Sequence, residues 1–171
     1  MQIYIESRDV CLDDLVIRFA PDMKQAVLIR GSGTVLMQGC QVEGRCGEPG
    51  SAAVRMEGSG FGNWLTAHSC QVNNSHGCGL FVIGGSMVTL NACSVSGIRL
   101  YDFTGGPSAV LQDCKCESSS SRCGLLVRGQ GSAANARTSS FRSSLCDGVS
   151  VKCNGSFRDA CGGNESATHL A

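Results

Sequence analysis

Asp13 and Asp14 form the acidic pair that most directly suggests catalysis in this sequence. Two carboxyl groups that face one bound sugar can divide the work of glycoside hydrolysis, because one protonates the leaving oxygen while the other activates water or attacks the ring. No other two acidic residues are adjacent in the chain. The hypothesis of a carboxylate-based hydrolase therefore starts at this pair.

Cysteine and histidine are the other residue types here that could hold a metal or act as nucleophiles. The chain has 12 cysteines and 3 histidines. Zinc sites use paired ligands at close spacing such as Cys-x-x-Cys. The nearest approaches are Cys114-Lys115-Cys116 and His76-Gly77-Cys78, and neither has that spacing. The sequence therefore predicts no metal site and no cofactor.

The glycine-rich segment GSGFG at Gly58 resembles a phosphate-binding loop in composition only. Phosphate-binding loops open a helix whose N-terminus faces the anion. Similar Gly/Ser clusters recur along this chain, at Gly31, Gly84, Gly105 and Gly129, and no helical pattern follows them. They are typical of turns.

Length and charge narrow the class of protein. At 171 residues we expect one domain spanning residues 1–171. Fourteen basic residues balance fourteen acidic ones, so nothing indicates a nucleic-acid partner.

The chain contains no apolar run of about 18 to 20 residues, the length that would predict a membrane-spanning helix. The N-terminus lacks signal-peptide features. We expect a soluble intracellular protein, most simply cytoplasmic, although the sequons at Asn73, Asn154 and Asn164 leave a secretory route open.

A repeat of apolar residues is the strongest signal in the sequence. Val88, Leu90, Cys93 and Val95 stand at offsets zero, two, five and seven. The same spacing recurs in five further units, whose third positions are Leu15, Cys40, Cys70, Cys114 and Ser139. Successive third positions are separated by 25, 30, 23, 21 and 25 residues. Intervals of this size are typical of stacked solenoid coils.

A second apolar pair precedes each unit, and its alternation is typical of a short strand with one buried face. The expected inward pairs are Ile3/Ile5, Val27/Ile29, Val54/Met56, Leu80/Val82, Tyr101/Phe103, Leu125/Val127 and Val149/Val151. The sequence thus predicts an all-β, parallel β-helix of about seven coils, each of roughly 21 to 30 residues. We expect regular coils over residues 1–157 and a degenerate coil or tail over 158–171.

The segment CQVNNSHGCGLFVIGGSMVTLNACSV resembles the right-handed parallel β-helix repeats of pectate-lyase-like proteins. The resemblance covers nearly the whole chain and implies that fold. It does not fix the function, since it extends to polysaccharide lyases and hydrolases, phage tailspikes and eukaryotic adaptors. Ser75-His76-Gly77 is similar to the Gly-His-Gly motif of polygalacturonases, but the accompanying motifs of that enzyme are missing. We interpret His76 as a loop residue.

The repeat also favours structural roles for the candidate groups. Asp13 and Asp14 occupy the corner held by Asn91-Ala92 in another coil, where short polar residues cap turns. Cysteines recur at equivalent places: Cys40, Cys70, Cys93, Cys114 and Cys116 inward, and Cys46, Cys78, Cys123 and Cys146 near loops. We interpret them as a buried ladder of thiols, with disulfides between adjacent coils as the alternative.

The outward residues of the first strands form the candidate binding face, because residues beside the inward ones point to solvent. Large apolar side chains in a row outside a solenoid indicate an interface unless another segment covers them. The candidate site residues are Leu28, Arg30, Arg55, Glu57, Phe81, Ile83, Asp102, Leu126, Arg128 and Lys152.

Three functions compete for this face. We expect a structural or scaffolding module that binds a protein, within a larger assembly or as a piece of a longer chain, because solenoid ends require caps. The alternative is a carbohydrate-active lyase or hydrolase whose polar groups would be Arg30, Arg55, Arg128 and Asp102. An ice-binding surface is a third, weaker interpretation, since regular threonine arrays are missing. No complete catalytic motif is present, so we do not expect an enzyme.

Overall fold

The structure, a computed structural model, describes residues 2–6, 9–101, 106–118, 124–143, 148–152, 155–159 and 168–170. Within these ranges, the side chains of residues 59–61, 152, 159 and 168–170 are not described. The described residues contain strands and no helix. In particular, they contain no helix long and apolar enough to cross a membrane.

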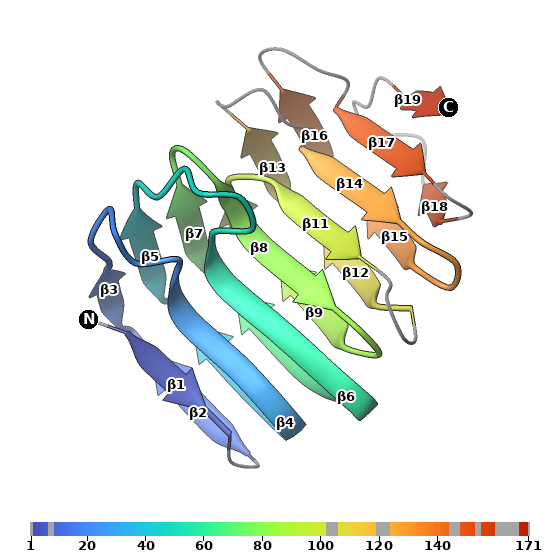
Figure 1. Cartoon of the computed structure of the whole chain (residues 1–171). Coiled ribbons are helices and arrows are strands. Elements are labelled where there is room, and N and C mark those ends of the chain that lie inside the picture. Colours follow the sequence, from blue (N-terminus) through green and yellow to red (C-terminus); the bar gives the residue numbers. More distant parts are fainter. Residues whose placement is uncertain are drawn as a thin grey trace.

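Three ladders of parallel strands stack along one axis, which confirms the predicted parallel β-solenoid (Figure 1). The first ladder comprises β1 (Ile3–Ile5), the N-terminal parts of β4 (Gln25–Gln38) and β6 (Ala52–His68), β8 (Cys78–Ile83), β11 (Ile98–Tyr101), β14 (Leu125–Arg128), β17 (Val149–Lys152) and β19 (Thr168–Leu170). The second comprises β2 (Val10–Asp13), the C-terminal parts of β4 and β6, β9 (Met87–Asn91), β12 (Ser108–Gln112), β15 (Ala133–Arg137) and β18 (Ser156–Asp159). The third comprises β3 (Val16–Arg18), β5 (Gln41–Gly44), β7 (Gln71–Asn74), β10 (Ser94–Val95), β13 (Lys115–Ser118) and β16 (Ser140–Ser143).

The number of coils is slightly smaller than expected. The third ladder is a 6-stranded sheet in the described part of the chain, so fewer coils are complete than the roughly seven predicted. The first two ladders form a single 13-stranded sheet because β4 and β6 run through both. The predicted turns at Gly31 and Gly58 are therefore bends inside long strands, and the pairing register shifts between Gly31 and Gly33.

The core consists of inward side chains stacked on like side chains, in the register that the repeat predicts, except that Leu15, expected at an inward third position, is 38% exposed. Leu90 lies between Ala67 and Leu111, and all three are almost fully buried. The prediction was wrong for β11, where Ile98 and Leu100 point inward in place of Tyr101 and Phe103. Both pairs consist of apolar residues two positions apart, but it is Ile98 and Leu100 that align with the inward Leu80 and Val82 of the preceding coil. Phe103 lies outside the described residues.

A left-handed residue turns the chain between the second and third strands of six coils. The positive φ angles occur at Asp14, Gly39, Ser69, Ala92, Asp113 and Thr138. This conformation suits Gly and Asp better than other residue types. Asp14 lies at this corner, as predicted, whereas Asp13 is the last residue of β2; both are exposed.

The cysteine ladder satisfies the corner backbone. The thiols of Cys40, Cys70, Cys93 and Cys114 each donate to the carbonyl two residues earlier, over 3.1 to 3.4 Å. Ser139 makes the same contact with its hydroxyl, over 2.9 Å to Arg137. Burial raises the pKa of Cys114 to about 11, so its thiol stays protonated and can donate. All eight described cysteines are free thiols, as the ladder interpretation expects; Cys123 and Cys146 lie outside the described residues.

A column of very small residues precedes the first inward position of six successive coils, while in the first coil Gln2 holds this place. Its members are Ala26, Ala53, Gly79, Gly97, Gly124 and Gly148, and all are buried. At Gly79, a Cβ atom would lie 2.5 Å from the Val72 carbonyl oxygen and 2.7 Å from a methyl group of Val95. The chain enters each first strand against the backbone of the neighbouring coil, and only a minimal side chain fits there.

Candidate functional site

The first-strand face consists of the outward side chains of the first ladder. One row aligns Tyr4, Leu28, Arg55, Phe81, Arg99, Leu126 and Ser150, and the next aligns Arg30, Glu57, Ile83, Tyr101 and Arg128. Eight of the ten predicted site residues lie in these two rows. Lys152 aligns with Arg128, but its side chain is not described. Asp102 lies outside the described residues, and Arg99 and Tyr101 hold the positions expected for its strand.

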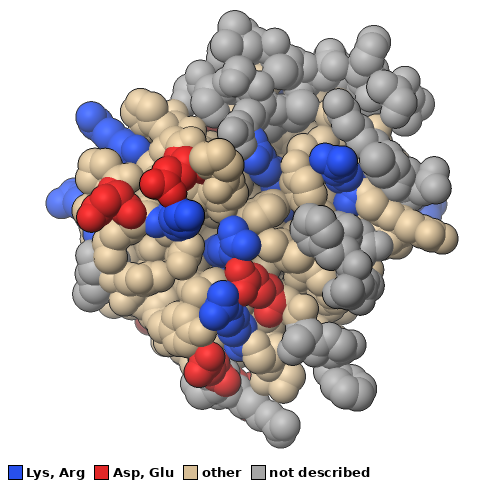
Figure 2. Space-filling view, in the orientation of Figure 1, with Lys and Arg blue, Asp and Glu red and all other residues tan. Residues whose placement is uncertain are grey.

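A charged network occupies the N-terminal half of this face. Glu57 accepts a hydrogen bond from Arg30 Nε over 2.5 Å and another from Arg55 Nε over 2.6 Å. Arg30 also donates to the Tyr4 hydroxyl over 2.9 Å, and Arg55 to the Gly50 carbonyl over 2.9 Å. Figure 2 shows basic and acidic side chains side by side on this side of the molecule. The network fixes the orientation of both guanidinium groups.

Aromatic rings support the same arginines. The guanidinium of Arg55 lies 5.0 Å from the centre of the Phe81 ring, and that of Arg128 lies 5.7 Å from the Tyr101 ring. Phe81 and Tyr101 contact each other edge to face, with centres 5.2 Å apart. Cation–π contacts of this kind hold a guanidinium in place without removing its charge. The face is thus an ordered ladder of cations and rings.

The predicted apolar patch is largely covered. Leu28 is only 4% exposed and Phe81 only 8%. Phe81 belongs to a small cluster with Ala52 and Cys78, separate from the main core, against which Tyr101 packs. The expectation that these two side chains are open to a partner was therefore wrong.

Glu57 gives this face a testable pH dependence. Partial burial by itself raises the pKa of Glu57, but hydrogen bonds from Arg30 and Arg55 outweigh it, so the net pKa is lowered. A lowered folded-state pKa contributes stability above the unfolded pKa of about 4.3, which is lost as the pH falls through the folded value. We expect wild type to lose up to about 1 kcal/mol more than Glu57→Gln between pH 6 and 3. Urea unfolding at a series of pH values measures the free energy of unfolding of both proteins. The same pH dependence in wild type and Glu57→Gln would contradict the prediction.

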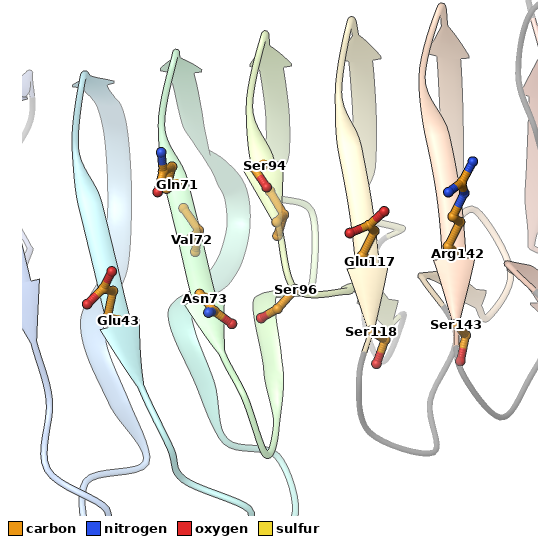
Figure 3. Close-up of a pocket in the computed structure, with 11 residues that line it drawn as sticks. Glu43, Gln71, Val72, Asn73, Ser94, Ser96, Glu117, Ser118, Arg142 and Ser143 are labelled. Carbon is orange, nitrogen blue, oxygen red and sulfur yellow. The ribbon is translucent and has the colours of Figure 1, made fainter.

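A groove crosses the third ladder, on a different side of the solenoid. Its volume is about 550 Å³, and it is lined by Glu43, Gln71, Val72, Asn73, Ser94, Val95, Ser96, Glu117, Ser118, Arg142 and Ser143 (Figure 3). β10 has only two residues, whereas β7 and β13 beside it have four each. The chain therefore leaves the sheet early at β10 and the neighbouring strands form the walls.

The chemistry of this third-strand groove favours binding over hydrolysis. Amide and hydroxyl side chains line its middle, Glu43 lies at one end on β5, and Glu117 and Arg142 lie towards the other end on β13 and β16. Those two carboxylates lie on strands three steps apart, or about 14 Å. The paired carboxylates of glycosidases lie about 5 to 10 Å apart. Glu43 and Glu117 cannot act on one glycosidic bond in this arrangement.

A second hollow of about 630 Å³ adjoins the groove and shares Glu43 and Asn73 with it. His76 is exposed in the turn after β7, as predicted for a loop residue, and its Nδ1 lies 3.0 Å from the Ser75 hydroxyl. The sequence repeat did not indicate this hollow. The 21-residue interval between Cys93 and Cys114 was the available signal for a shortened coil.

Comparisons with protein-family models, with curated proteins and with solved structures gave no match to this chain. Functional assignment therefore rests on the geometry of the chain itself. Among the described residues, no group of three or more His, Cys, Asp or Glu side chains is arranged to hold a metal ion.

Proposed function

We propose that this chain is a scaffolding β-solenoid that binds a partner protein through its first-strand face. The observation that carries the proposal is the ladder of arginines held over aromatic rings and around Glu57. Arginine and tyrosine are enriched among the residues that dominate binding energy at protein interfaces. Side chains that are already ordered lose less conformational entropy when a partner binds.

The chemistry of the face also suggests what the partner presents. Arg30, Arg55 and Arg128 outnumber Glu57 in the described part of these rows, and Arg30 is 46% exposed. Glu57 is held by two arginines and is poorly placed to accept or give a proton in catalysis. We therefore expect a partner segment that carries carboxylates, and not a substrate that is turned over here.

An affinity pull-down from lysate of the source organism, quantified by mass spectrometry, tests the proposal. Wild type is compared with an Arg30→Glu, Arg128→Glu double variant and with Lys115→Glu, an exposed charge reversal on the third ladder. We expect a partner whose recovery falls at least about tenfold in the double variant and is unchanged in the control. A partner set that survives the double variant contradicts the proposed face.

The third-strand groove favours one alternative function, the binding of a carbohydrate. Hydroxyl and amide groups there are suited to the hydroxyl groups of a sugar chain, and the resemblance to pectate-lyase-like repeats points in the same direction. A glycan array distinguishes the two functions. Binding that is lost in Asn73→Ala and retained in the Arg30→Glu, Arg128→Glu variant, together with no protein partner, would replace the scaffold proposal.

A further inference from the structure

The outward side of the second ladder is uncharged over its four middle strands, and this surface is here called the second-strand face. On the described parts of β4, β6, β9 and β12 its residues are Thr34, Leu36, Gln38, Trp64, Thr66, His68, Met87, Thr89, Asn91, Ser108, Val110 and Gln112. None is Asp, Glu, Lys or Arg. Trp64 is 56% exposed, Met87 43% and Val110 45%. Large apolar side chains exposed together indicate a contact surface.

In the described part of this ladder, outward charges lie only on the strands beyond these four, with Asp13 on β2 at the N-terminal end and Arg137 on β15 and Arg158 on β18 at the C-terminal end. Asp13 and Arg137 lie in the same row, in register through Gln38, His68, Asn91 and Gln112. Asp13 is on β2, at the N-terminal end of the row, and Arg137 is on β15, five strands further along. Both side chains are exposed, and neither forms an ion pair within the described part of the chain.

We propose that a second copy of this chain docks on the second-strand face, about a two-fold axis parallel to the strands and between β6 and β9. This axis reverses the order of strands, so β2 faces β15, β4 faces β12 and β6 faces β9 of the partner copy. Asp13 then lies opposite Arg137 of the other copy, twice in each dimer. An isologous interface requires this kind of self-complementarity.

The same axis matches the apolar residues without any further adjustment. In the row formed by Thr34, Trp64, Met87 and Ser108, Trp64 faces Met87 of the other copy. In the row formed by Leu36, Thr66, Thr89 and Val110, Leu36 faces Val110 and Thr66 faces Thr89. Two-fold pairing thus covers the three most exposed apolar side chains of the face with apolar or sulfur-containing partners. The uncharged middle gives no site for a charged partner, which favours a second copy over an acidic or basic polymer.

The area of the second-strand face sets the expected affinity of the dimer. Six strands at about 4.8 Å spacing and five residues at about 3.3 Å cover roughly 480 Å² in each copy. The total of about 950 Å² lies below the range of stable interfaces, so the dimer is weak and depends on concentration. We expect a dissociation constant in the range of tens to hundreds of micromolar.

Sedimentation of the full chain from about 5 to 500 μM, a range that spans the expected dissociation constant, tests the dimer with a charge swap. Asp13→Arg and Arg137→Asp each place like charges opposite one another, and we expect each to weaken dimerisation about tenfold. The double variant Asp13→Arg, Arg137→Asp restores both pairs and returns to within about threefold of wild type. Arg30→Glu, on the first-strand face, leaves the dimer unchanged and separates this proposal from the proposed function.

Three outcomes overturn the proposal. The first is wild type that stays monomeric throughout the concentration range, the second is a double variant that stays as weak as the single variants, and the third is Trp64→Asp that dimerises like wild type. Circular dichroism confirms that each variant is folded, which is expected because all three residues are exposed. Restoration by the double variant cannot arise from a folding defect.

Discussion

Leu90→Asp is expected not to fold. Leu90 is 2% exposed and lies in the middle of the central inward ladder. A buried carboxylate without a partner costs several kcal/mol, and the loss of the leucine adds about 2 to 5 kcal/mol. Their sum approaches the whole stability of an ordinary domain, about 5 to 15 kcal/mol. Far-ultraviolet circular dichroism and urea unfolding measure the result.

Thr89→Asp is the matched control for this prediction. Thr89 is the preceding residue on β9, and its side chain points to solvent. The same carboxylate one position away should leave the fold intact at low micromolar concentration, because a surface substitution usually changes stability by less than about 0.5 kcal/mol. A folded Leu90→Asp protein with the wild-type spectrum would show that the inward register is wrong.

Gly79→Val is expected to destabilise the protein by about 3 kcal/mol or more, through steric overlap and not through charge. Its Cβ would meet the Val72 carbonyl oxygen at 2.5 Å and the Ser96 amide nitrogen at 2.9 Å. These two backbone atoms are hydrogen-bonded to each other, and the Gly79 amide donates to the Ser96 carbonyl, so they cannot move aside without breaking hydrogen bonds between coils. For a chain of this size the melting temperature should fall by roughly 10 °C.

Gly47→Ala is the comparison for that variant. Gly47 is exposed, and an added Cβ would come no closer than 3.3 Å to the His76 side chain. We expect its melting temperature to stay within about 2 °C of wild type. Equal melting temperatures for Gly79→Val and wild type would mean that the small-residue column does not set the approach of adjacent coils.

The fold could be predicted because each coil repeats one constraint. A residue such as Val88 is buried by the coils on both sides, so the apolar pattern must recur at every turn of the solenoid. The error at β11 arose where the pattern offered two alternating pairs, Ile98/Leu100 and Tyr101/Phe103. Alternation fixes which residues share a face but not which pair stacks on Leu80 and Val82.

The candidate site was harder to predict, because exposure depends on neighbours that are remote in sequence. Phe81 does alternate outward as expected, but it is buried through contacts with Ala52 and Tyr101 on adjacent coils. The groove depends on the length of β10 relative to β7 and β13, a difference of two residues. No periodic pattern records that difference directly.

The buried thiols at one corner of four successive coils also provide built-in reporters. Each of Cys40, Cys70, Cys93 and Cys114 is protected from solvent by its own coil and the next. A thiol-modifying reagent can reach one of them only when that part of the solenoid opens. The labelling rates of the individual cysteines would therefore map where along its length the stack separates first, coil by coil, without the introduction of any new cysteine.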